Sequence, residues 1–358
     1  MQQNQLMKTT AFYTVLFAIC SLAVIFYYSA HKVVVVADLA QDEVVQRSEE
    51  VRQETAAEAV AGQNEILFVS NGQEMTYFCI PLHEEIKAEN VTIENHYMDK
   101  ELWVSLRQPE LIQSLSDFYR QQGAYGNRDA VISGYFEEGA DTFWLKFRLA
   151  DIYEYHSIFE DSKLYIEFVT PKEAYDKIVV IDPAYGGDIT GASSGKLKGK
   201  DVALNIARAL KKKLDDTDIK VYYTRMDDSA PSDESRVNLI NSVKADMVIR
   251  IETNENEDTK IYGTEAVYNS KFFIPGFGSV ELADMLEREV VTAISGKANG
   301  LVDAEEGDTV IRDATVPAAA IRVGYVTNGQ ESILLNRDDY IEKIAEGIYQ
   351  AIEAAYAL

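Results

Sequence analysis

Four acidic side chains in the second half of the chain stand where they could bind a metal ion: Asp182, Asp188, Asp201 and Glu252. Their oxygen atoms suit Mg²⁺ or Ca²⁺ better than Zn²⁺. Each also fits an ordinary structural role, since Asp201 begins a predicted helix and Asp182 and Asp188 are typical turn residues. Two interpretations follow, an oxygen-lined metal site or a set of capping and turn residues.

Zinc chemistry in this half lacks its usual ligands. Catalytic zinc needs about three protein ligands of imidazole, carboxylate or thiolate type and an open position for water. The four histidines and two cysteines all precede residue 170: His31, His83, His96, His156, Cys20 and Cys79. A lone carboxylate does not hold zinc tightly enough to generate hydroxide near neutral pH. A zinc site would therefore need a histidine from the first half, of which His156 is nearest in sequence.

Strands alternate with amphipathic helices after Pro171, which is the order of an α/β domain. The first strand, KIVVI, precedes Tyr185-Gly186-Gly187, and a helix with Val202 and Ile206 on its apolar face follows. The glycine spacing does not fit G-x-G-x-x-G, and no phosphate-loop lysine motif follows it. A nucleotide site is therefore disfavoured.

Five segments of this half are similar to the zinc-dependent N-acetylmuramoyl-L-alanine amidases that act on peptidoglycan. They occur in the family's order and spacing: IVVIDPAYGGDITGA (178–192), KDVALNIARALKKKL (200–214), VYYTRMDD, SRVNLINSVKADMVIRIETN and PAAAIRVGYVTN. Together they cover nearly all of residues 177–358. The resemblance implies the type 3 catalytic-domain fold, an α/β domain of three layers with a mixed sheet.

The resemblance also indicates where the family's zinc ligands would lie. The family's Asp-Pro-Gly-His-Gly-Gly, whose histidine binds zinc, corresponds to a segment with Tyr185 at the histidine position. The ligand glutamate that precedes Lys-Asp-Val corresponds to Gly199. The histidine of Ser-Ile-His-x-Asn corresponds to Glu252. The resemblance therefore implies a degenerate member without zinc ligands, and no cofactor is expected, with zinc as the alternative.

The family's catalytic glutamate, in Val-Glu-x-Gly-Phe-x-x-Asn, corresponds to Arg322. A fixed positive charge repels a divalent cation and cannot act as a general base. We expect Arg322 and Glu252 to form an ion pair in the vacated cleft, the alternative being a role in ligand binding. Framework positions of the family are retained: Asp182, Gly186, Gly187, Asp201, Arg225, Arg236, Asn254, Gly324 and Asn328.

The first half predicts an anchor, a stalk and a second domain. Residues 9–30 are apolar, free of charged residues and long enough to span a bilayer as a helix, with a cleaved signal peptide as the alternative. Residues 1–8 would be cytoplasmic, 31–63 a helical or flexible stalk, 64–170 a small β-rich domain and 171–358 the amidase-like domain. The anchor's basic flanks do not fix its orientation. The extracytoplasmic substrate of the family implies that the N-terminus lies inside and the bulk of the chain outside the cell membrane.

Short strand-like runs dominate the β-rich domain: ILFVS, MTYFCI, VTIENHY, LWVSL, TFWLKF and KLYIEF. One helix is predicted at residues 110–122. The aromatic residues of this domain are consistent with the core of a small sheet or with a glycan-binding face.

A net charge of −25 disfavours nucleic acid as a partner. The first functional hypothesis is an envelope protein that binds peptidoglycan or a cell-wall enzyme without cutting. Its residual groove would comprise Tyr185, Glu252, Asn254, Arg322 and Asn328, and could hold an acidic stem peptide. The second is an active amidase that hydrolyses the bond between N-acetylmuramic acid and L-alanine.

Overall fold

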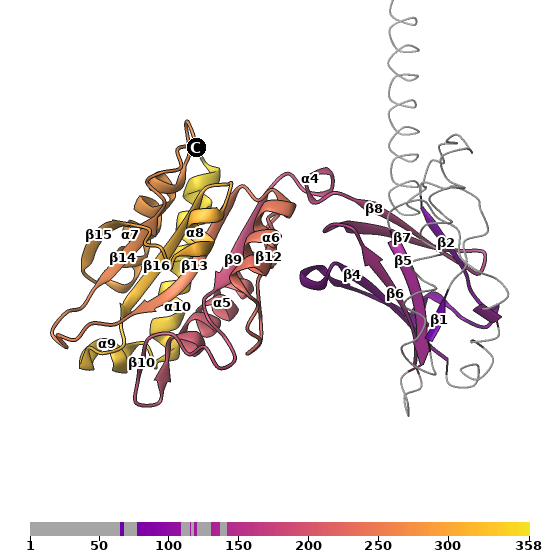
Figure 1. Cartoon of the computed structure of the whole chain (residues 1–358), viewed down its shortest axis with the longest axis horizontal. Helices are drawn as coiled ribbons and strands as arrows, with labels where there is room; N and C mark the ends of the chain where they lie inside the picture. The colour runs from indigo at the N-terminus through magenta and orange to yellow at the C-terminus, as the bar shows by residue number, and fades with distance from the viewer. Residues whose placement is uncertain (1–64, 68–76, 109–114, 116–117, 120–129, 137–141) are drawn as a thin grey trace, which may run out of the picture. The chain divides into compact units, whose positions relative to one another are not determined.

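The structure is a computed structural model that describes residues 65–67, 77–108, 115, 118–119, 130–136 and 142–358 (Figure 1). The predicted anchor (9–30) and stalk (31–63) lie outside these residues. Within the described segments, no helix is both long and apolar enough to cross a membrane. The chain divides into two compact units between Val169 and Thr170, which are described separately below.

The first unit consists of two antiparallel sheets. Its five-stranded sheet has the order β1-β5-β6-β4-β3, and its three-stranded sheet has the order β2-β8-β7. The strand bounds are β1 Glu65–Leu67, β2 Phe78–Pro81, β3 Val91–His96, β4 Glu101–Arg107, β5 Ala130–Phe136, β6 Thr142–Leu149, β7 Glu154–Glu160 and β8 Lys163–Val169. Short 3-10 helices occur at η1 Ala88–Asn90 and η2 Tyr97–Asp99. Of the predicted helix at 110–122, the structure describes Leu115, Phe118 and Tyr119, which have helical backbone.

Two of these strands were not expected from the sequence. The β5 segment contains Gly134, and glycine weakens the strand signal because it has no side chain to pack. The β7 segment, EYHSIFE, is largely polar and lacks a regular apolar alternation. Both strands form because they pair with neighbours, β5 with β6 and β7 with β8.

Aromatic side chains of the first unit pack between its two sheets. Phe78 of β2 meets Phe147 of β6 and Phe168 of β8 edge to face, with ring centroids 5.4 and 5.7 Å apart. On the other face of the larger sheet, His96 stacks on Trp103 at 4.0 Å, and the Lys146 ammonium lies 3.6 Å from that ring centroid. The Trp103 ring is thus contacted from both neighbouring strands, which argues against sugar stacking on it.

The second unit is a three-layer α/β domain, as the resemblance implied. Its six-stranded mixed sheet has the order β12-β9-β13-β16-β14-β15, in which β16 and β14 are antiparallel and the other neighbours are parallel. The strands are β9 Ile178–Pro183, β12 Lys220–Tyr223, β13 Met247–Asn254, β14 Thr264–Tyr268, β15 Ala298–Asp303 and β16 Ala318–Tyr325; a hairpin is formed by β10 Ser193–Ser194 and β11 Leu197–Lys198. The helices are α4 Pro171–Ala174, α5 Gly199–Leu214, α6 Asp233–Val243, α7 Ser279–Ile294, α8 Thr309–Asp313, α9 Gly329–Leu334 and α10 Asp338–Tyr356.

Alternate strand residues face different helical layers. Ile181, Ile249 and Ile321 pack into one core with α5, α7 and α10. Residues of the other parity, such as Val180 and Val248, face the layer formed by the neighbouring helices α6 and α8. Because side chains alternate along a strand, this parity decides which layer a residue reaches.

Helices α7 and α10 pack so closely that a glycine is required between them. A Cβ added at Gly347 of α10 would lie 2.5 Å from the Val290 Cα and 2.8 Å from the Glu289 carbonyl oxygen. Helix propensity alone would favour alanine here by up to about 1 kcal/mol. The steric conflict with backbone atoms is the larger effect.

We therefore predict that Gly347→Ala destabilises the chain by about 1–3 kcal/mol, measured by urea unfolding. Gly329→Ala is the matched control, since nothing lies within 4 Å of a Cβ at Gly329. A Gly347→Ala variant as stable as the control would contradict the close approach of α7 and α10.

Candidate functional site

A row of charged residues crosses the sheet on the face that α6 and α8 cover. Asp182 of β9 and Arg250 of β13 are register partners, and so are Glu252 of β13 and Arg322 of β16. Because side chains alternate along a strand, these charged residues lie on the same face of the sheet as the apolar residues that stand an even number of positions before them. The same face is therefore apolar near the start of these parallel strands and charged near their carboxyl ends.

Asp182 is the most deeply buried member of the row. Its carboxylate is fully buried and accepts hydrogen bonds from the Arg236 and Arg250 guanidiniums and, at 2.5 Å, from the Thr224 hydroxyl. Burial favours the neutral acid, but the guanidiniums of Arg250 and Arg236 outweigh it and hold the pKa of Asp182 below its ordinary value. Asp182 is therefore a permanent anion at neutral pH.

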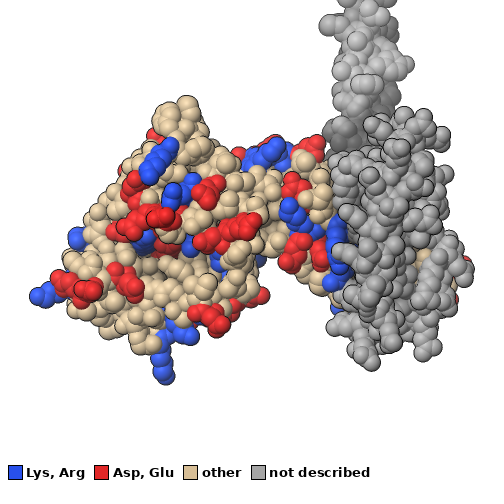
Figure 2. Space-filling view, in the orientation of Figure 1, with Lys and Arg blue, Asp and Glu red and all other residues tan. Residues whose placement is uncertain are grey.

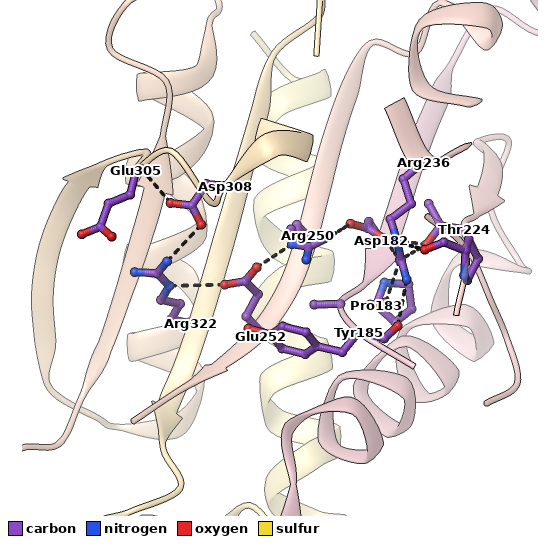
Figure 3. Close-up of polar contacts among 12 residues, drawn as sticks. Asp182, Pro183, Tyr185, Thr224, Arg236, Arg250, Glu252, Glu305, Asp308 and Arg322 are labelled. Carbon is purple, nitrogen blue, oxygen red and sulfur yellow. Dashed lines mark hydrogen bonds and ion pairs between the residues drawn. The ribbon is translucent and has the colours of Figure 1, made fainter. Parts of the chain in front are cut away.

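The row continues from Arg250 to Arg322 through Glu252 (Figure 3). Arg250 Nε donates to Glu252 Oε1 at 2.5 Å, and Arg322 Nε donates to Glu252 Oε2 at 3.3 Å. The predicted ion pair between Arg322 and Glu252 is thus confirmed, with Arg250 as a second partner of the same carboxylate. Both oxygens of Glu252 are committed to guanidinium groups.

Arg322 binds two further carboxylates. Its Nη1 donates to Glu265 Oε1 at 3.1 Å, and its Nη2 donates to Asp308 Oδ1 at 3.2 Å. Burial lowers the tendency of Arg322 to stay charged, but Glu252 and Asp308 reverse this and raise its pKa above the ordinary value. Arg322 is therefore a fixed cation.

Tyr185 lies in the turn after β9 with left-handed backbone, at φ 64°. Its ring lies against Gly191, where an added Cβ would come within 2.4 Å of the ring, and the Arg250 guanidinium is 5.8 Å from its centroid. Burial first, and then the charge of Glu252, raises the pKa of Tyr185 to about 12. Tyr185 consequently presents a neutral phenol.

The second unit is similar to known amidases. Residues 179–354 match the family model described as N-acetylmuramoyl-L-alanine amidase. The germination-specific N-acetylmuramoyl-L-alanine amidase of Bacillus subtilis is 30% identical over an alignment of 190 residues, and the match covers 49% of this chain and 78% of that protein. The chain belongs to the N-acetylmuramoyl-L-alanine amidase family.

Two further comparisons each cover about half of the chain. The amidase LytC of Bacillus subtilis is 25% identical over 178 residues, which cover 50% of this chain and 35% of LytC. The crystal structure of an N-acetylmuramoyl-L-alanine amidase from Clostridium difficile 630 is 29% identical, covers 51% of this chain and 97% of its own, and has a TM-score of 0.47.

Gly199, at the position that the amidase resemblance gives to a ligand glutamate, begins α5 in close contact with β13. A Cβ added there would lie 2.5 Å from the Thr253 hydroxyl oxygen, and the Gly199 amide donates to the Ala192 carbonyl at 2.8 Å. In the described part of the chain, the buried Thr253 hydroxyl has no hydrogen-bond partner. Any side chain at residue 199 requires Thr253 to move.

The residues at the three amidase ligand positions do not fit zinc. They supply a neutral phenol at Tyr185, no side chain at Gly199, and a carboxylate at Glu252 whose oxygens both accept from arginines. Arg322 adds a permanent charge that opposes a divalent cation.

The alternative oxygen-lined metal site is not assembled. Asp188 and Asp201 are exposed, and Asp182 is engaged by Arg236 and Arg250. Among the residues that the structure describes, no three histidine, cysteine or acidic side chains gather closely enough to hold a metal ion. His156 is paired with Glu167 within the first unit.

The two asparagines of the predicted groove have structural roles. Asn254 Nδ2 donates to Glu265 Oε1 at 2.7 Å, which joins it to the charged row. Asn328 caps α9, accepting from the amides of Gln330 and Glu331. The structure therefore brings together Tyr185, Glu252, Arg322 and Asn254, whereas Asn328 holds a neighbouring helix.

Sequence reasoning missed Arg250, Glu265 and Asp308. The alternation of side chains along β13 was sufficient to place Arg250 on the same face of the sheet as Glu252. Glu265 is the second residue of the strand-like TEAVY, but only the pairing of β14 with β16 shows that it meets Arg322. Asp308 precedes a short helix, and no pattern in the sequence marks its contact.

We predict that Asp182→Asn destabilises the chain by about 3–5 kcal/mol at pH 7, because it leaves Arg236 and Arg250 without their shared anion. Since the pKa of Asp182 is lowered by folding, its contribution is present above about pH 4 and is lost as pH falls through the lower folded value. Urea unfolding of both proteins from pH 7 to pH 2.5 measures this difference.

The matched control is Asp218→Asn, which removes an exposed ion pair with Lys177 and should change stability little. A constant difference between Asp182→Asn and the parent chain down to pH 2.5 would contradict the assignment of Asp182 as the titrating group.

Proposed function

We propose that this chain is a membrane-anchored cell-envelope protein whose amidase-family domain binds peptidoglycan or a cell-wall enzyme without hydrolysing the substrate. Residues 9–30 would provide the single-pass anchor, with the N-terminus inside and both units outside the cell membrane. Family membership supports the envelope assignment. The loss of catalysis is our inference from the residues that stand at the family's zinc-ligand and catalytic positions.

The observation that carries the proposal is the position of Arg322. The amidase resemblance aligns it with the catalytic glutamate, and its guanidinium binds Glu252, which the resemblance aligns with a zinc ligand. A guanidinium has no accessible basic form in proteins, so it cannot deprotonate water. Arg322 thus stands where the family has its general base, and its positive charge also opposes the binding of a metal ion.

The same contacts revise the ligand expected in the groove. The positive charge of Arg322 is neutralised by Glu252, Glu265 and Asp308, so it is not available to attract the carboxylates of an acidic stem peptide. The viewer-facing side of the second unit carries acidic and basic side chains interspersed rather than a basic patch (Figure 2). We propose that binding relies on shape and neutral polar groups such as the Tyr185 phenol.

The second candidate function is hydrolysis of the bond between N-acetylmuramic acid and L-alanine. Family membership and the similarity to two amidases of Bacillus subtilis favour it. Hydrolysis would require three zinc ligands other than the residues that stand at the family's ligand positions.

We predict that the purified full-length chain, kept in detergent with added zinc, binds less than stoichiometric zinc and releases no stem peptide from sacculi, yet pellets with them. Metal analysis, chromatography of the soluble products and pelleting measure the three properties, with an active amidase of the family assayed in parallel. Tyr185→Ala should weaken pelleting, whereas Arg337→Ala, which removes an exposed pair with Asp339, should not.

One bound zinc with release of stem peptide would establish the hydrolase instead. Absence of pelleting without hydrolysis would exclude peptidoglycan as the ligand and leave a cell-wall enzyme as the partner.

A further inference from the structure

Three carboxylates from separate parts of the second unit converge on one guanidinium. Glu252 belongs to β13, Glu265 to β14, and Asp308 directly precedes α8. Each accepts from a different nitrogen of Arg322: Nε at 3.3 Å, Nη1 at 3.1 Å and Nη2 at 3.2 Å. The three acids therefore surround the planar fork and contact every nitrogen in it.

These carboxylates depend on a cation because they are shielded from water. The side chains of Glu252, Glu265 and Asp308 are 5%, 13% and 13% exposed. Like charges in such a place repel one another strongly, since the effective dielectric is lower than in water. Within the described residues, the ion pairs of Glu265 and Asp308 run to Arg322 alone.

Neighbouring polar groups hold the acids in position. Glu265 also accepts from Asn254 Nδ2 at 2.7 Å and from the Tyr325 hydroxyl at 3.3 Å, and Asp308 accepts from the Glu305 amide at 2.8 Å. These donors fix the acids independently of Arg322. A pocket supported in this way should keep its arrangement when the arginine side chain is shortened.

We infer that Glu252, Glu265 and Asp308 form a guanidinium-specific cation pocket, which the chain fills with its own Arg322. The pocket selects a planar cation with three directed nitrogens over a compact ammonium, because each carboxylate meets a separate N–H direction. The three carboxylates are thus balanced by a cation that belongs to the chain itself.

The test is chemical rescue of the full-length Arg322→Ala chain with methylguanidinium chloride. Arg322→Ala should lower the Tm of the chain by about 10 °C, because Glu265 and Asp308 lose the cation they pair with and Glu252 keeps only Arg250. Millimolar methylguanidinium should bind with a stoichiometry of one by calorimetry and recover a few degrees of Tm in a saturable way. Methylammonium should recover less.

The unsubstituted chain and Arg337→Ala are the controls, and neither should bind methylguanidinium. Arg337 forms an exposed pair with Asp339, so its removal leaves no shielded acids. A folded Arg322→Ala chain that keeps the parent Tm, or that shows no saturable binding of methylguanidinium, would overturn the inference.

A second comparison applies even where Arg322→Ala fails to fold. Arg322→Lys keeps a cation but loses the fork, and Arg322→Met keeps the length but loses the charge. Arg322→Lys should fall between the parent chain and Arg322→Met in Tm. An Arg322→Lys chain with the Tm of the parent chain would overturn the inference, because an ammonium would then serve as well as a guanidinium. Neither experiment depends on zinc or hydrolysis, so its failure is distinguishable from failure of the proposed function.

Discussion

The second unit depends on the anion of Asp182, which is buried completely at the end of the first strand of its sheet. A buried carboxylate is costly unless cations and hydrogen bonds satisfy it. Arg236 supplies charge from α6 and Arg250 supplies it from β13, so the anion ties β9 to a helix above and a strand beside it. The same Arg236 binds the Pro183 and Tyr185 carbonyl oxygens and thereby sets the path of the turn after β9.

The alternation of charge across the sheet follows from this anion. Asp182 requires Arg250, and Arg250 is held on its other side by Glu252, whose second oxygen is bound by Arg322. Neighbouring strands stand close enough for cross-strand pairs of opposite charge to stabilise the register. Removing Arg250 or Glu252 takes one ion-pair partner from each of two charges of the opposite sign, so the members of the row should be strongly coupled rather than additive.

The sequence predicted those parts of the arrangement that depend on neighbouring residues or on the spacing of the family's motifs. The α/β order followed from periodicity, and the pair of Arg322 and Glu252 followed from the resemblance, because family spacing brings two distant segments to one place. The position of Arg250 beside Glu252 could have been predicted from the alternation of side chains along β13. The positions of Glu265 and Asp308 could not, because their contact with Arg322 depends on β14 running antiparallel to β16 and on the path of the chain into α8. The strands β5 and β7 were missed for the related reason that pairing, rather than their own composition, stabilises them.

Arg322 balances the charge of three carboxylates without any group from outside the chain. Zinc binding depends on external metal concentration and on deprotonated ligands, and it leaves a position open for water. Arg322 is covalently part of the chain, stays protonated because Glu252 and Asp308 raise its pKa, and directs all three of its nitrogens to carboxylates. The contacts of Arg322 with Glu252, Glu265 and Asp308 therefore do not depend on metal concentration. The charge balance of these three carboxylates is thus built into the fold, since it is set by the strand pairing of β13, β16 and β14 and by the path of the chain into α8.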